Sequence, residues 1–284
     1  MNRSMTSVLF AALAALGLQT AQAAPTLERG RYLMDGVVAC GNCHAARGER
    51  GAIVAAKGLS GGMVFDDPLF KAVAPNITPD AATGIGRYTD AQLVKAIREG
   101  VRPDGRLIGP PMPIEFYRHM SDDDVGSIVL YLRSQPPVAN AVAKSEYRMP
   151  LPPNYGPPVG TVKAPPATQT VKYGEYLANI GHCMECHTAR DAKGMPKVAQ
   201  LGAGGMVFKG PWGESVSRNL TPAGLKDWTD AQIAKAIRTG TDRNGHPYQP
   251  PMAFEFYKNI SDADIRALIA YLRTLKPVAP PGKG

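Results

Sequence analysis

Two copies of one five-residue pattern, Cys-x-x-Cys-His, stand at residues 40–44 and 183–187. In this pattern two thiols on one helical turn reach the two vinyl groups of a porphyrin, and the adjacent histidine supplies a nitrogen to its iron. The chain has four cysteines, and the two copies use all of them. The sequence therefore predicts two covalently bound haems c, with these residues holding the porphyrins and their irons: Cys40, Cys43, His44, Cys183, Cys186 and His187.

Other uses of paired cysteines explain the pattern less well. A zinc site built from both pairs normally brings them closer in sequence, whereas well over one hundred residues separate them here. Disulfides within each pair would leave the two histidines unexplained. A redox-active Cys-x-x-Cys usually occurs once, near a βαβ sequence pattern, and no such pattern is evident here.

A six-coordinate iron needs a second axial ligand, and a methionine thioether in that position raises the potential. Two pairs of methionines recur at equivalent positions: Met112 with Met252, and Met63 with Met206. We prefer Met112 and Met252, because each follows two prolines that preset the backbone and remove amide donors. The other pair stands between Gly-Gly and Val-Phe, where packing against a haem is the alternative role.

Four residues are candidate donors to the haem propionates. Asn76 and Asn219 each precede an apolar residue and Thr-Pro, and Tyr88 and Trp228 each precede a threonine that begins a helix. Their amide, phenol and indole groups suit a buried carboxylate, which is costly without such partners. Ordinary turn and packing roles explain them equally well.

The residues that would hold the haems lie in two halves of the chain that resemble each other. Matching blocks are Gly-x-Tyr-Leu at 30–33 and 174–177, Gly-Gly-Met-Val-Phe at 61–65 and 204–208, Pro-Pro-Met at 110–112 and 250–252, and Tyr-Leu-Arg at 131–133 and 271–273. We interpret the chain as a tandem duplication. The predicted domains span 24–135 and 170–284, and the proline-rich residues 136–169 form an extended linker between them.

Helices are the readable elements of each half. Capping boxes at 89–92 and 229–232 predict helix starts, and Gly100 and Gly240 suit the left-handed caps that end these helices. Second helices are predicted from Ser121 and Ser261. Gly30 and Gly174 would let an opening helix cross the last one closely. We therefore expect an all-α fold.

The ends and the charge of the chain indicate where it works. Residues 1–23 have the basic start, apolar run and small-x-small site of a secretory signal, although an uncleaved anchor is the alternative. No second apolar stretch follows, so a soluble periplasmic protein without a membrane span is expected. The net charge is +8, but the sequence contains no dense basic run, and a secreted haem protein is not expected to meet nucleic acid. Residues 170–276 hold 14 Lys and Arg against 10 Asp and Glu, which suits either an acidic docking partner or scattered solvated lysines.

The chain resembles the c-type cytochrome subunits of bacterial alcohol and gluconate dehydrogenases. The residues that carry the resemblance are Gly-x-Tyr-Leu, Cys-x-x-Cys-His, Asn-Ile-Thr-Pro-Asp at 76–80, Thr-Gly-Ile-Gly at 83–86, Pro-Pro-Met, and Met-Ser-Asp at 120–122 leading to Tyr-Leu-Arg. The resemblance implies two tandem class I cytochrome c domains, with iron ligated axially by His44, Met112, His187 and Met252. Those subunits commonly carry three haems and a membrane-associating tail, which this sequence lacks.

Electron transfer without substrate chemistry is the function that these features predict. A periplasmic dehydrogenase would be the donor, and a cytochrome or terminal oxidase the acceptor. The alternative is an enzyme of the di-haem cytochrome c peroxidase type, which needs one iron with an open or displaceable position. A haem-based ligand sensor is a third possibility.

Overall fold

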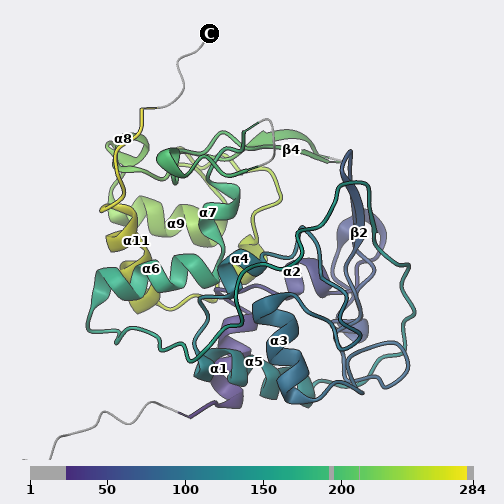
Figure 1. The fold of residues 1–284 in the computed structure, drawn as a ribbon. Coiled ribbons are helices and arrows are strands. Elements are labelled where there is room, and N and C mark those ends of the chain that lie inside the picture. Colours follow the sequence, from purple (N-terminus) through teal and green to yellow (C-terminus); the bar gives the residue numbers. More distant parts are fainter. Residues whose placement is uncertain (1–23, 192–194, 211, 280–284) are drawn as a thin grey trace, which may run out of the picture.

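The computed structural model describes residues 24–191, 195–210 and 212–279, so the predicted signal 1–23 lies outside the described part. Two similar sets of helices follow each other along the chain (Figure 1). The N-terminal unit contains α1 (Leu27–Met34), α2 (Gly41–His44), α3 (Asp90–Glu99), α4 (Ile114–Tyr117) and α5 (Asp122–Ser134). The C-terminal unit contains α6 (Thr170–Ile180), α7 (Cys183–Cys186), α8 (Pro222–Leu225), α9 (Asp230–Thr239), α10 (Phe254–Tyr257) and α11 (Asp262–Leu272).

Local capping explains where the longer helices begin and end. The side chains of Thr89 and Thr229 accept from the backbone N–H of Gln92 and Gln232. Each glutamine side chain in turn accepts from the backbone N–H of its threonine, so both predicted capping boxes form. Gly100 and Gly240 take the left-handed conformation at the C-caps of α3 and α9.

The first and last helices of each unit cross at a glycine. A Cβ atom added at Gly30 would lie 1.9 Å from the backbone oxygen of Ser127 in α5, and one at Gly174 would lie 1.9 Å from that of Ala267 in α11. No side chain fits in such a space, so only glycine lets the two helices approach this closely. The buried stripes of α5 and α11 then complete the core, which includes Leu33, Ile128, Leu132, Leu177, Leu268 and Leu272.

The expectation of an all-α fold was wrong, because each unit also carries a β-hairpin. β1 (Val64–Asp67) pairs antiparallel with β2 (Phe70–Val73), and β4 (Val207–Gly210) pairs with β5 (Gly213–Val216). A third strand, β3 (Glu146–Tyr147), joins β2. Four-residue strands are too short for period-2 alternation to show clearly in the sequence. Their Val-Phe pairs favour a strand, but two apolar residues are too few to predict one without its partner strand.

The linker runs along the N-terminal unit in extended form rather than as a free tether. Figure 1 shows this teal chain passing beside β2 before it reaches α6. Its contacts include β3 and a hydrogen bond from the Tyr155 hydroxyl to the carbonyl of Ile108 (2.8 Å). No helix within the described residues is long and apolar enough to cross a membrane.

A reciprocal pair of tyrosines joins the two units. The Tyr32 hydroxyl in α1 donates to Asp264 Oδ2 (2.7 Å) and accepts from the backbone N–H of Ser261 (3.1 Å) at the start of α11. The Tyr176 hydroxyl in α6 donates to Asp124 Oδ2 (2.5 Å) in the same way, and it also accepts from the backbone N–H of the N-cap residue of α5 (3.1 Å). Each opening helix thus binds the N-terminus of the last helix in the other unit.

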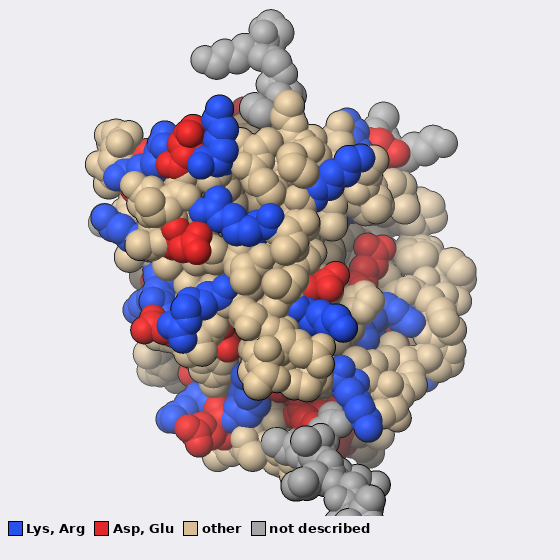
Figure 2. Space-filling model, turned by 90° about the vertical axis from the view of Figure 1, so that its left-hand side faces the viewer, with Lys and Arg blue, Asp and Glu red and all other residues tan. Residues whose placement is uncertain are grey.

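Charged side chains of both signs are interspersed on the face that Figure 2 shows. This face therefore presents no single-sign field of the kind that steers a charged partner. Elsewhere in the chain, equivalent helices carry matched ion pairs, such as Arg133 with Asp90 (3.0 Å) and Arg273 with Asp230 (2.9 Å).

Candidate haem-binding site

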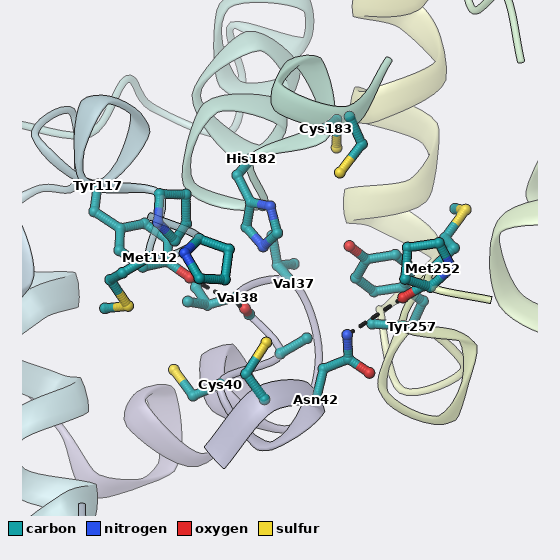
Figure 3. A pocket seen from close by; sticks show the side chains of 18 of the residues that line it. Val37, Val38, Cys40, Asn42, Met112, Tyr117, His182, Cys183, Met252 and Tyr257 are labelled. Carbon is teal, nitrogen blue, oxygen red and sulfur yellow. Dashed lines mark hydrogen bonds between the residues drawn. The ribbon is translucent and has the colours of Figure 1, made fainter. Parts of the chain in front are cut away.

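A cavity of about 1100 Å³ extends through both units, and most of its wall is apolar. All four motif cysteines and both motif histidines line it. Figure 3 shows the region where the two units meet, with Cys40 and Met112 on one side and Cys183 and Met252 on the other. The residues that the sequence predicts as haem ligands therefore share one continuous cavity.

The two motif histidines are held in the orientation that an iron ligand needs. His44 Nδ1 lies 2.9 Å from the carbonyl oxygen of Pro75, and His187 Nδ1 lies 2.7 Å from that of Arg218. A carbonyl can only accept, so Nδ1 carries the proton and Nε2 keeps its lone pair for a metal. Burial lowers the pKa of both imidazoles and so favours this neutral form.

The cysteines belong to the single helical turns α2 and α7, with Cys40 as the N-cap of α2, and all four line the cavity. Burial raises the pKa of Cys40 and Cys186 to about 12, and that of Cys43 and Cys183 to about 11. Reactive dithiols have a lowered pKa, so these thiols lack the character of a redox pair. Within the described ranges, no three His, Cys, Asp or Glu side chains are grouped to hold a metal ion directly.

The structure separates the two pairs of candidate methionines. Met112 and Met252 line the cavity, on loops that lead into α4 and α10 after cis Pro-Pro bonds. Met63 and Met206 do not line it. They stand at the start of the hairpins, where the carbonyl of Met63 accepts from Ala74 N (2.8 Å). Only the first pair is placed to reach an iron inside the cavity.

The four candidate propionate donors all line the cavity, but the asparagines also have another role. Asn76 Nδ2 donates to the carbonyl of Val138 (2.7 Å) and to Thr83 Oγ1 (3.0 Å), which uses both of its N–H groups. Asn219 Nδ2 donates to the carbonyl of Val278 (2.8 Å). Each asparagine thus fixes the chain that follows the last helix of its unit.

Sequence reasoning missed two tyrosines in the cavity, of which Tyr117 is buried and Tyr257 partly buried. Tyr117 and Tyr257 line it at the ends of α4 and α10, and burial raises the pKa of both well above its ordinary value. The ring of Tyr117 meets that of His182 from the other unit edge-on at 6.0 Å. A signal was available, because each tyrosine follows its Pro-Pro-Met by five positions.

These residues fit a haem. An apolar cavity of this size accepts a porphyrin, each Cys-x-x-Cys turn presents two thiols to it, and each histidine has Nε2 free for the iron.

Comparison with known proteins agrees with this fit. The family model for cytochrome c matches residues 171–276. A diheme cytochrome c-type protein of Cereibacter sphaeroides is 32% identical over 252 residues, covering 84% of this chain and 82% of the relative. The chain belongs to the cytochrome c family.

Other relatives of this cytochrome are subunits of dehydrogenases. The fructose dehydrogenase cytochrome subunit of Gluconobacter japonicus is 29% identical, over 91% of this chain and 54% of the relative. The gluconate 2-dehydrogenase cytochrome c subunit of Pantoea cypripedii is 29% identical, over 97% of this chain and 65% of the relative. This cytochrome therefore spans little more than half the length of several relatives that it matches.

Proposed function

We propose that this cytochrome carries two haems c and transfers electrons between a periplasmic dehydrogenase and a downstream respiratory acceptor, with no substrate chemistry of its own. The observation that carries the proposal is the matched pair of ligand sets. His44 with Met112, and His187 with Met252, line one cavity, each set in its own unit. The names of the dehydrogenase subunits support the partner class.

The residues of this cytochrome define what each site can do. When bound, haem iron supplies a one-electron couple whose potential its axial ligands set. The carbonyls of Pro75 and Arg218 orient the histidines, and the apolar wall excludes water from the iron. Two closed sites of the same design favour carrying electrons over activating a substrate. The proposal includes the secretory signal, since covalent haem attachment takes place outside the bacterial cytoplasm. It also includes the tandem duplication, which supplies one haem site in each unit.

The test of this function is the number of electrons that the full-length protein, matured with its haems, delivers per chain. We expect the fully reduced protein to deliver two electrons per chain to a one-electron acceptor protein. We also expect the half-reduced protein to consume hydrogen peroxide no faster than free haem does. Sustained peroxide turnover by the half-reduced form would assign the chain to the peroxidase type instead.

A further inference from the structure

Part of the linker covers one face of the N-terminal unit. We call residues 139–162 the strap. Its strand β3 pairs with β2, with Glu146 opposite Lys71 and Tyr147 opposite Phe70. One residue before β3, Ser145 Oγ accepts from the backbone N–H of Val73 (3.0 Å). The edge of the hairpin is therefore closed by the protein's own chain.

The strap continues from the hairpin to α3. The Tyr147 ring lies so close to Gly109 that a Cβ atom there would be 2.5 Å from it. Further along, the backbone N–H of Val159 donates to Glu99 Oε1 (2.9 Å), and Arg98 Nη2 donates to the carbonyl of Gly160 (2.9 Å). Ser145 and Tyr147 also line the cavity. The strap thus forms one edge of the N-terminal haem site.

The C-terminal unit has the same hairpin, but among the described residues no third strand pairs with β5. Val216 in β5 is 54% exposed, whereas Val73 at the equivalent place in β2 is 8% exposed. The neighbouring residue, Ser217, donates its backbone N–H to the carbonyl of Met206 on the β4 side (2.9 Å). Because alternate residues of an antiparallel strand direct these groups to opposite sides, the N–H and C=O of Val216 face the open edge.

The uncovered face has the composition of an interface. The rings of Tyr248 and Phe254 stack at 6.2 Å, and the guanidinium of Arg218 lies 4.9 Å over the Tyr248 ring. Aromatic residues and arginine are enriched at protein interfaces. Val216, Arg218, Tyr248 and Gln249 line the cavity as well, so this face borders the C-terminal haem site.

We propose that this face of the C-terminal unit docks an extended, acidic segment of the redox partner, which adds to β5 as a strand and closes the C-terminal site as the strap closes the N-terminal one. The occupied edge of β2 shows that this hairpin design accepts an added strand. The excess of Lys and Arg over residues 170–276, 14 against 10, and the position of Arg218 favour a carboxylate-bearing segment. This inference rests on the proposed function and adds that the partner approaches the C-terminal site.

The test compares prolines on the two edges of one hairpin. Val216→Pro removes the outward N–H of β5, whereas Val207→Pro is the matched control at the opposite edge, in β4, where the valine is 49% exposed. Arg218→Glu is a second variant, which reverses the charge of the side chain and keeps the backbone carbonyl that accepts from His187 Nδ1. The readout is the rate at which the matured protein is reduced by the dehydrogenase recovered with the affinity-tagged chain from its native cells. Reduction by dithionite serves as the small-molecule reference.

We expect Val216→Pro and Arg218→Glu each to slow reduction by the dehydrogenase about tenfold or more, which corresponds to about 1.4 kcal/mol. Val216 and Arg218 border the C-terminal haem site, so the dehydrogenase rate of each variant is divided by its own dithionite rate, and the tenfold loss is expected in that ratio. Val207→Pro should behave as wild type. Equal rates in all variants would overturn the docking site and leave the proposed function standing. Failure of every recovered dehydrogenase to reduce even the wild type would contradict the proposed function itself.

Two other occupants of the face give different results. If a second copy of the chain binds there, sedimentation will show a concentration-dependent dimer that Val216→Pro abolishes. If residues 280–284 cover the edge, deleting them will speed hydrogen exchange of the Val216 amide in the isolated protein. Either result would overturn the proposal. An acidic segment of the dehydrogenase cross-linked to a photoreactive residue at position 216, and not at 207, would support it.

Discussion

At the scale of single residues, the sequence marks His44 and His187 as candidate ligands, but it does not indicate what orients their rings. The Cys-x-x-Cys-His pattern identifies His44 and His187 directly. The carbonyls that orient them belong to Pro75 and Arg218, two residues of different type. Every residue has a carbonyl, so no side-chain pattern marks the two that matter. Tyr117 and Tyr257 recur at the same spacing from Pro-Pro-Met, which marks them as a repeated pair, but only the fold shows that both line the cavity.

Replacing each cavity methionine tests the sixth ligand. Met112→Ala or Met252→Ala should each lower the potential of one haem by on the order of 100 mV, a fraction of the roughly 0.8 V range that axial ligation covers. Each variant should also open that iron to carbon monoxide. Redox titration with optical detection measures both effects. Met63→Ala and Met206→Ala are the controls, because neither residue lines the cavity. A shifted potential in the controls alone would transfer the ligand role to that pair.

At the scale of elements, the capped helices could be predicted and the hairpins could not. Thr89 and Gln92 form a capping box within four residues, so the local sequence is enough to predict where this helix begins. The hairpins depend on pairing between strands of four residues, which carry too few positions for a periodic signal. The hydrogen bonds between the units could not be predicted either. Tyr32 and Tyr176 belong to a repeated block, but the repeat does not indicate that each hydroxyl binds an aspartate of the other unit.

Removing either inter-unit hydroxyl should destabilise the protein. Tyr32→Phe leaves Asp264 Oδ2 and the backbone N–H of Ser261 without their partner, and Tyr176→Phe leaves the backbone N–H of Ser121 without one, whereas Asp124 Oδ2 keeps its bond from Arg29. We expect a cost of about 1–3 kcal/mol for each variant. Unfolding of the matured protein by guanidinium measures the loss. Tyr131→Phe is the matched control, since its 3.4 Å contact to Asp35 stays within one unit. An equal loss in the control would show that the effect is not specific to the contact between units.

The same contact should respond to alkaline pH. Burial, as the largest cause, raises the pKa of Tyr32 to about 12 from an ordinary value of 10.0. The folded state therefore holds this proton more tightly than the unfolded state does. The stabilisation should be complete below about pH 10 and decline as the pH rises toward 12. In Tyr32→Phe this decline should be smaller, and an unchanged pH profile would contradict the assignment.

At the scale of the whole molecule, the two units are alike in their haem sites and unlike in their surroundings. The strap closes the edge of the N-terminal unit, and the matching edge of β5 lies open. The sequence predicted an extended proline-rich linker, but its path depends on contacts with distant residues such as Val73 and Gly109. Such contacts have no local sequence signal. Under the docking proposal, this asymmetry gives different tasks to two similar sites.

A spectroelectrochemical titration of the matured wild-type protein tests the central claim, that this cytochrome holds two haems, each closed by histidine and methionine. The titration should show two one-electron steps per chain, with all haem absorbance low-spin in both oxidation states. This result follows from His44 with Met112 and His187 with Met252 in one cavity. A single one-electron step, or a high-spin ferric haem in the wild-type protein, would contradict the account.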